Sequence, residues 1–117
     1  MEEVKELLIT SKEFLANLID DTKDICELLQ GAEETQALKL MPELFDGIFL
    51  IIKAMSQLES NDVTIMINES ISDRLHELEE AMIIRDNVLI CDILEYEIVP
   101  ILQQWYEALK NRLSEGL

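Results

Sequence analysis

Four acidic residues have a spacing that would suit a metal ion. Glu77 and Glu80 form an ExxE pair, and Asp92 and Glu95 form a DxxE pair after an 11-residue gap. On a helix, residues three apart share one face, so each pair would present two carboxylates in the same direction. If the two helices were antiparallel across a turn near Arg85, the pairs could converge. Four carboxylates would then suit Mg²⁺ or Mn²⁺.

This pattern resembles the ExxE and ExxD motifs of the all-α nucleotide pyrophosphohydrolases of the MazG and dimeric dUTPase type. The resemblance implies a magnesium-dependent hydrolase of nucleoside triphosphates, in which Glu77 and Glu80 match the first motif. The second motif is reversed, with Asp92 leading and Glu95 trailing, and the sequence has no basic cluster for the phosphates. In a chain with 25 acids, ExxE also arises readily on a solvated face. The hydrolase is therefore the alternative function, and magnesium is expected as a cofactor only under it.

A structural role is the leading interpretation of Asp92 and Glu95. Both lie on a helical stripe with apolar residues, and a buried carboxylate is costly unless it is paired or protonated. A polar network that ties helices together would satisfy them. The candidate donors are the side chains of Lys53, Arg74, Arg85, Tyr96, Trp105 and Tyr106.

Other kinds of catalytic or metal site find little support. His76 follows Asp73 with a DxxH spacing, but a ferritin-like di-iron site needs two such motifs. Cys26 and Cys91 form no CxxC pair, which excludes a standard zinc site. Buried free thiols favour a reducing compartment, and the acidic N-terminus is unlike a signal peptide, so we expect a cytoplasmic location.

The first two predicted helices come from periodic apolar residues. A heptad seam with alternating spacings of four and three predicts a helix over 2–30, ended by Gly31. Its seam residues are Val4, Leu8, Ser11, Leu15, Leu18, Thr22, Ile25 and Leu29. A second helix is predicted over 33–58, where Pro42 indicates a kink or a short first piece ending near residue 40, and Gly47 would permit a close helix crossing. Its predicted inner face is Leu38, Met41, Phe45, Ile48, Ile52 and Met55.

Two further helices complete the prediction. The third runs over 63–81, after a turn with Asn61 or Asp62 as its cap. The fourth has Asp86 as its N-cap and extends to about residue 113. It should bend at Pro100, because the proline ring clashes with the carbonyl four residues earlier.

The stretch from Asp86 to Trp105 organises the rest of the chain. Nearly every position between Val88 and Leu102 is apolar, so the helix should be covered on several sides. About 15 residues are too few to span a bilayer. We therefore expect residues 1–117 to form a single all-α domain, an antiparallel four-helix bundle with kinked second and fourth helices and the fourth helix inside.

The same stretch resembles the signature of small, acidic, uncharacterised helical proteins of Gram-positive bacteria, roughly D-x-V-L-x-x-D-x-L-E-Y-E-x-x-P-x-L-x-x-W. The matching positions are Asp86, Asp92, Leu94, Glu95, Tyr96, Glu97, Pro100, Leu102 and Trp105. This resemblance implies a fold and no mechanism. We assign structural roles to Asp86, Asp92, Glu95, Tyr96, Pro100 and Trp105.

The formal charge of −16 limits the classes of molecule that the protein could bind. The charge is evenly divided along the sequence, since residues 1–60 and 61–117 each sum to −8. Nucleic acid and anionic membrane surfaces would be repelled, whereas a basic segment of another protein would be attracted. High negative charge also serves solubility alone.

The leading function is accordingly a non-catalytic, cytoplasmic helical-bundle protein that binds another protein, as an adaptor or in the manner of an export chaperone. The comparison with export chaperones rests on size, acidity and helicity, not on a motif. A homodimer is a further expectation, because four residues predicted to be exposed are apolar. These residues are Ile65, Met66, Ile83 and Ile84.

Overall fold

The chain is all-helical in the computed structural model, which describes residues 2–60 and 70–115. The elements are α1 (Glu2–Gln30), α2 (Glu34–Ser60), α3 (Ser70–Ile83), α4 (Asn87–Ile93), the π-helical turn η1 (Leu94–Ile98) and α5 (Val99–Ser114). These described residues include no strand, so the predicted all-α class is confirmed.

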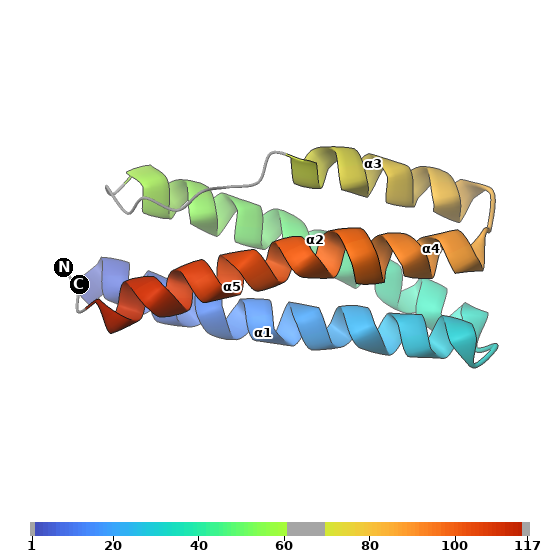
Figure 1. The fold of residues 1–117 in the computed structure, drawn as a ribbon, viewed down its shortest axis with the longest axis horizontal. Helices are drawn as coiled ribbons and strands as arrows, with labels where there is room; N and C mark the ends of the chain where they lie inside the picture. Colours follow the sequence, from blue (N-terminus) through green and yellow to red (C-terminus); the bar gives the residue numbers. More distant parts are fainter. Residues whose placement is uncertain (1, 61–69, 116–117) are drawn as a thin grey trace.

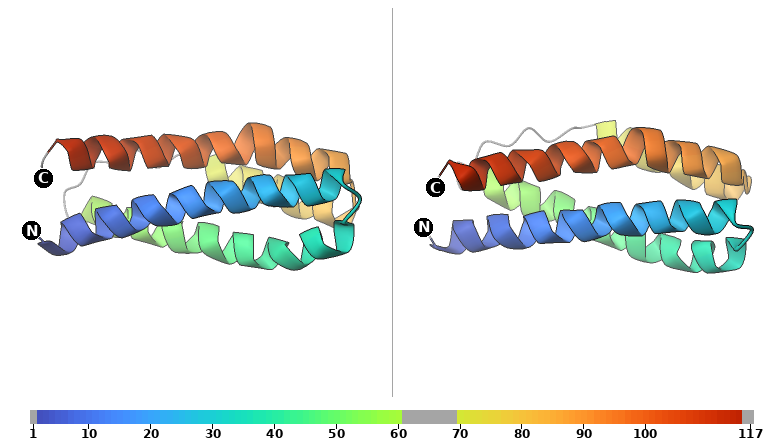
Figure 2. Two further views of the ribbon diagram at one scale, coloured as in Figure 1. Left: turned by 90° about the horizontal axis from the view of Figure 1, so that it is seen from below. Right: turned by 60° about the horizontal axis from the view of Figure 1, so that its bottom comes forward.

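The helices form an elongated body of 47 × 22 × 19 Å. Figure 1 shows α1 leading away from the end that holds both termini and α2 returning to it. After α3, the continuous path of α4, η1 and α5 leads back to the termini, as the two views of Figure 2 also show. The closest helix pairs are α1 with α2, α1 with α5, and α3 with α4. The α3–α4 turn therefore lies at the end of the molecule opposite the termini.

The first helix agrees closely with its prediction. All eight seam residues are buried, and the helix ends at Gln30. The Thr22 hydroxyl donates a hydrogen bond of 2.7 Å to the Leu18 carbonyl oxygen, which lets a polar side chain sit in the core. The heptad spacing thus correctly identified the face of α1 that the other helices cover.

The second helix differs from its prediction in two ways. It runs without interruption through Pro42, so a separate short helix ending near residue 40 is wrong. Its buried face is also displaced by about one position from the predicted one, and three predicted core residues are only half-buried. The buried residues of α2 are Ala37, Met41, Leu44, Gly47, Ile48, Ile51, Met55 and Leu58. Apolar residues fill adjacent positions here, so the sequence pattern does not define the inner face uniquely.

Gly47 allows α1 and α2 to cross closely, as predicted. A Cβ atom at this position would lie 2.6 Å from Cδ2 of Leu18 and 3.5 Å from Cζ of Phe14. A larger residue would have to displace the Leu18 side chain, which is itself buried.

The third helix can be compared with its prediction only from Ser70 onward. Its buried residues include Ile71, Leu75 and Leu78, whose spacings of four and three place them on one face of the helix. The predicted start at Val63 and the predicted cap at Asn61 or Asp62 lie outside the described residues.

The prediction that the fourth helix is internal is wrong at its beginning. Ile90, Cys91, Ile93 and Leu94 are buried, but Val88 is 73% exposed. The reason is that α1 and α3 cover two sides of α4, and no other described helix packs closely against the remaining side. An apolar run of this kind marks a buried core on one face and an uncovered apolar surface on another.

A π-helical turn connects α4 to α5 just before Pro100. The Val99 N–H donates to the Leu94 carbonyl oxygen, five residues earlier, in place of the usual spacing of four. A π turn accommodates one extra residue and shifts the carbonyls that precede the proline. The helical path consequently continues through this segment, and the predicted bend there stays a prediction.

The end of α1 is a Schellman motif with alanine in the position that glycine usually takes. Ala32 has a φ of 61°, in the left-handed region. The Glu33 N–H donates to the Leu28 carbonyl oxygen at 2.8 Å, which closes the motif. Gly31 follows the last helical residue, but the left-handed conformation lies one position later.

The turn between α3 and α4 has the same geometry with Arg85 in the left-handed position, at a φ of 57°. The Asp86 N–H donates to the Ala81 carbonyl oxygen at 3.1 Å. The Asp86 carboxylate in turn accepts a hydrogen bond of 3.0 Å from the Leu89 N–H, so the predicted N-cap is confirmed. One short segment therefore ends α3 and starts α4, which fixes the angle between them.

Glycine at these two left-handed positions should stabilise the fold. Ala32→Gly and Arg85→Gly should each raise the free energy of unfolding by about 0.5–1 kcal/mol, because a side chain is disfavoured at positive φ. Urea unfolding of the purified variants measures this change. Gln104→Gly, at an exposed position inside α5, should instead lower stability by about 1 kcal/mol. Equal losses at all three positions would contradict the assigned turn geometry.

Candidate functional site

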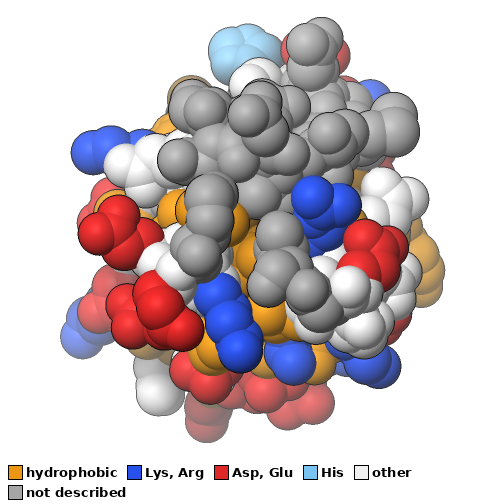
Figure 3. Space-filling model, turned by 90° about the vertical axis from the view of Figure 1, so that its left-hand side faces the viewer, with side chains coloured by type: hydrophobic (Ala, Val, Ile, Leu, Met, Phe, Trp, Pro, Cys, Tyr) orange, Lys and Arg blue, Asp and Glu red, His pale blue; other side chains and the backbone are white. Residues whose placement is uncertain are grey.

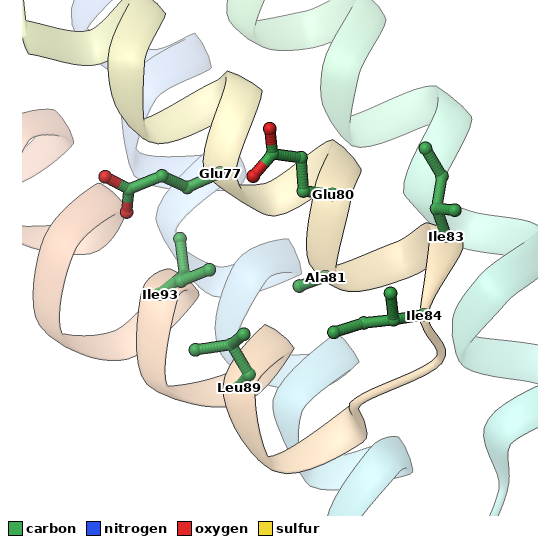
Figure 4. A pocket seen from close by; sticks show the side chains of 7 residues that line it. All are labelled: Glu77, Glu80, Ala81, Ile83, Ile84, Leu89 and Ile93. Atoms are coloured by element: carbon green, nitrogen blue, oxygen red, sulfur yellow. The ribbon is translucent and has the colours of Figure 1, made fainter.

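An apolar groove lies between α3 and α4, at the end of the molecule far from the termini. Its volume is about 420 Å³. Figure 4 shows the side chains that line it, with the carboxylates of Glu77 and Glu80 along its α3 edge. The remaining lining residues are Ala81, Ile83, Ile84, Leu89 and Ile93. The described fold thus leaves an uncovered hydrophobic surface next to two acidic side chains.

Exposed apolar residues extend this surface around the α3–α4 turn. Ile83 is 80% exposed and Ile84 is 67% exposed, as expected from the sequence. On the first turn of α4, Leu89 is 39% exposed and lines the groove, whereas the exposed Val88 lines a separate pocket beside Leu29 and Gln30 of α1. The turn that carries them is held by the Schellman motif and by the Asp86 cap. The apolar surface is therefore built on a fixed backbone.

The four acidic residues that would form a metal site under the alternative, hydrolase interpretation do not come together. Glu77 and Glu80 line the α3–α4 groove, whereas Asp92 lines a separate pocket of about 140 Å³ with Leu29 and Gln30. Within the described part of the chain, no group of three or more His, Cys, Asp or Glu side chains is placed to hold a metal ion. The convergence that the hydrolase interpretation requires is absent from these residues.

Arg74 links α3 to the π-helical turn through two carboxylates. Its Nη1 lies 2.9 Å from Oε1 of Glu77 and 2.8 Å from Oε1 of Glu97. The sequence analysis named Arg74 as a donor but assigned it to Asp92 or Glu95. No role was predicted for Glu97, the carboxylate that ties Arg74 to the π-helical turn.

The remaining residues assigned structural roles have varied surroundings. Asp92 is exposed and Glu95 is half-buried. Tyr96 is 71% exposed, so its ring lies mostly outside the core. Pro100 is half-buried directly after the π-helical turn, and Trp105 is completely buried in α5. Asp86 and Trp105 therefore have clear structural surroundings, while Tyr96 is a surface residue.

Glu80 also has a neighbour of its own on α3. Its Oε1 lies 3.2 Å from Nε2 of His76, one helical turn earlier, and both side chains are exposed. His76 thus lies beside the groove and not in a metal cluster. The pairing is solvated and contributes little to stability.

Two buried thiols face each other where α1 meets α4. The Cys26 thiol points to the Cys91 carbonyl oxygen at 3.9 Å, and the Cys91 thiol points to the Cys26 carbonyl oxygen at 3.7 Å. Burial, the Cys91 thiol and the Glu95 charge together raise the pKa of Cys26 to about 12. Burial also raises the pKa of Cys91. Both side chains are therefore held as neutral thiols, unlike reactive cysteines.

A second group of acids lies between α1 and α2, around a small pocket of about 120 Å³. Asp21, Asp24 and Glu43 are among its lining residues. Partial burial, followed by the charges of Asp24, Asp20 and Glu43, raises the pKa of Asp21. This pocket adds to the negative charge at the end of the molecule that also carries the α3–α4 groove.

The charge is uneven in three dimensions, although it is evenly divided along the sequence. Residues 20–46 and 73–97 contain sixteen acids and four bases. Both stretches lie in the half of the molecule remote from the termini. Figure 3 shows the opposite end, where Lys and Arg side chains lie interspersed with Asp and Glu side chains. The groove therefore lies in a strongly negative field.

Among the described residues, no helix combines the length and the hydrophobicity that a membrane span requires. Comparison with known proteins finds no match among curated proteins and none among solved structures. A family model does match residues 6–108, which includes the whole of α1 beyond its first turn, the groove and most of α5. The prediction of an uncharacterised family is thereby confirmed. The chain belongs to the family described as a domain of unknown function, DUF8042.

Proposed function

We propose that this chain is a non-catalytic, cytoplasmic protein that binds another protein through the α3–α4 groove, as an adaptor or an export chaperone does. In this proposal an antiparallel four-helix bundle is the support for the binding surface. The observation that carries the proposal is the uncovered apolar groove, whose lining includes the exposed side chains of Ile83, Ile84 and Leu89. Contiguous exposed apolar surface with a polar rim is typical of interaction sites.

The arrangement of the carboxylates favours this function over the hydrolase. A two-motif magnesium site needs Glu77 and Glu80 to face Asp92 and Glu95 across a shared space. Glu77 is bound to Arg74, and Asp92 lines a pocket on the α1 side of α4. Binding of a protein needs no such convergence, only an apolar surface that a partner can cover.

Site-specific cross-linking in the producing cell tests the proposal. A photoreactive amino acid at position 84 should cross-link to one defined protein, which mass spectrometry then identifies. The same amino acid at position 50 is the matched control, because Leu50 is 60% exposed on α2 and lies outside the groove. The identified partner, once purified, should bind the wild-type chain directly.

Loss of one apolar side chain from the groove should weaken that binding. Ile84→Ser should reduce affinity about tenfold or more, because burying an isoleucine contributes about 1.5–3 kcal/mol. Leu50→Ser should leave affinity unchanged. Equal binding by the two variants, or cross-links from position 84 only to other copies of this chain, would contradict the proposal. In the second case sedimentation should show a dimer that tightens as salt screens the like charges.

A further inference from the structure

We infer that the segment bound in the α3–α4 groove is an amphipathic helix whose apolar stripe is flanked by lysine or arginine. This inference rests on the proposed function and specifies the chemistry of the partner. It follows from two independent features of the groove, its shape and the charges on its rim.

The shape of the groove would accommodate one more helix, packed against both α3 and α4. The groove lies between α3 and α4, which pack against each other beside the turn that connects them. Ala81 is buried and small, and Leu89 and Ile93 line the α4 side. A helix laid along such a groove packs at about 8–10 Å from its neighbours and inserts residues spaced i, i+3 or i+4, and i+7. An apolar stripe of that period would cover the exposed isoleucines at the turn.

The acidic side chains around the groove favour a bound helix that carries positive charge. The single Arg74 guanidinium is shared between Glu77 and Glu97, so one negative charge of this group stays uncompensated. Residues 73–97 as a whole contain eight acids and two bases. Basic residues beside an apolar stripe would pair with these carboxylates and relieve their mutual repulsion, whereas acidic residues would add to it.

A second copy of this chain fits the same surface poorly. Each copy would bring the same acidic rim to the interface, and like charges set against each other are unfavourable. The other exposed apolar residues of the chain include Phe49 and Leu50, on α2, where Lys53 is the nearest base in sequence. One base does not offset the charges around the groove, so charge complementarity favours a different, basic partner.

Three designed peptides test this inference on the full chain. The first is an amphipathic helix with leucines on one stripe and lysines flanking it. The second has glutamates in place of the lysines. The third has the composition of the first with its leucines dispersed around the helix. Affinities are measured by isothermal titration calorimetry at about 50 mM and about 300 mM NaCl. The Debye length is about 10 Å at 0.1 M salt, so it is longer than this at the first concentration and shorter at the second.

The first peptide should bind about tenfold tighter than either control, and its binding should weaken at the higher salt concentration. Ile84→Ser and Leu89→Ser should each weaken it about tenfold, while Leu50→Ser should have no effect. Glu80→Gln should reduce the dependence on salt. Equal binding of the first and third peptides would show non-specific charge attraction and overturn the inference, as would equal or tighter binding of the glutamate peptide.

The outcome also separates this inference from the proposed function. If position 84 cross-links to a defined protein and none of the peptides binds, the chemistry assigned to the partner is wrong and protein binding stands. If the lysine peptide binds and position 84 captures nothing in the cell, the groove has the inferred chemistry and the proposed function fails.

Discussion

Replacing Trp105 by alanine should lower the free energy of unfolding by about 3–5 kcal/mol, which is a large share of the stability of a domain of this size. Trp105 is only 1% exposed, and α5, which carries it, packs along α1. Removal of the indole would leave a cavity among the apolar side chains of these helices, and the surrounding helices can collapse into it only in part. Urea unfolding followed by circular dichroism measures the loss.

Two variants control for this interpretation. Gln104→Ala changes the exposed neighbour of Trp105 and should change stability by less than about 0.5 kcal/mol. Trp105→Phe should cost less than the alanine substitution, because it keeps much of the volume. It also removes an indole N–H for which the described residues provide no hydrogen-bond acceptor. A melting temperature for Trp105→Ala within a degree or two of wild type would contradict the structural role.

The helices could be predicted from the sequence because their signals are local. The heptad seam of α1 and the Asp86 cap each depend on residues within a few positions of one another, and both are confirmed. The inner face of α2 could not be fixed in this way, since adjacent apolar residues leave several faces equally hydrophobic. The π-helical turn before Pro100 was also unforeseen, because a proline alone does not say how a helix adjusts around it.

The candidate site was predictable only in part. Ile83 and Ile84 are exposed as predicted, and Glu77 and Glu80 lie at the site. The concentration of negative charge at one end could not be seen in a sequence whose two parts carry equal charge. It arises from the reversal of chain direction, which brings residues 20–46 and 73–97 together. The same long-range folding sets Cys26 against Cys91, 65 residues later.

These two thiols should react very slowly while the chain is folded. A pKa raised from 9.0 to about 12 reduces the thiolate fraction of Cys26 at pH 8 about a thousandfold, and the thiolate is the species that reacts. Burial also keeps reagents away from both sulfur atoms. Reaction with Ellman's reagent should therefore proceed through unfolding, and should be immediate in denaturing urea.

The rate at which the thiols react should depend on the stability of the fold, and that stability should in turn depend on pH. Trp105→Ala, which raises the unfolded population, should accelerate the reaction of both thiols, and Gln104→Ala should not. Because the pKa of Cys26 is higher in the folded state than in the unfolded state, the folded chain keeps a proton that the unfolded chain loses. The resulting contribution to stability is complete below about pH 9 and is lost as the pH rises toward 12. Rapid reaction of both thiols at pH 8 without urea, at a rate unchanged by Trp105→Ala, would show that the α1–α4 contact opens without global unfolding.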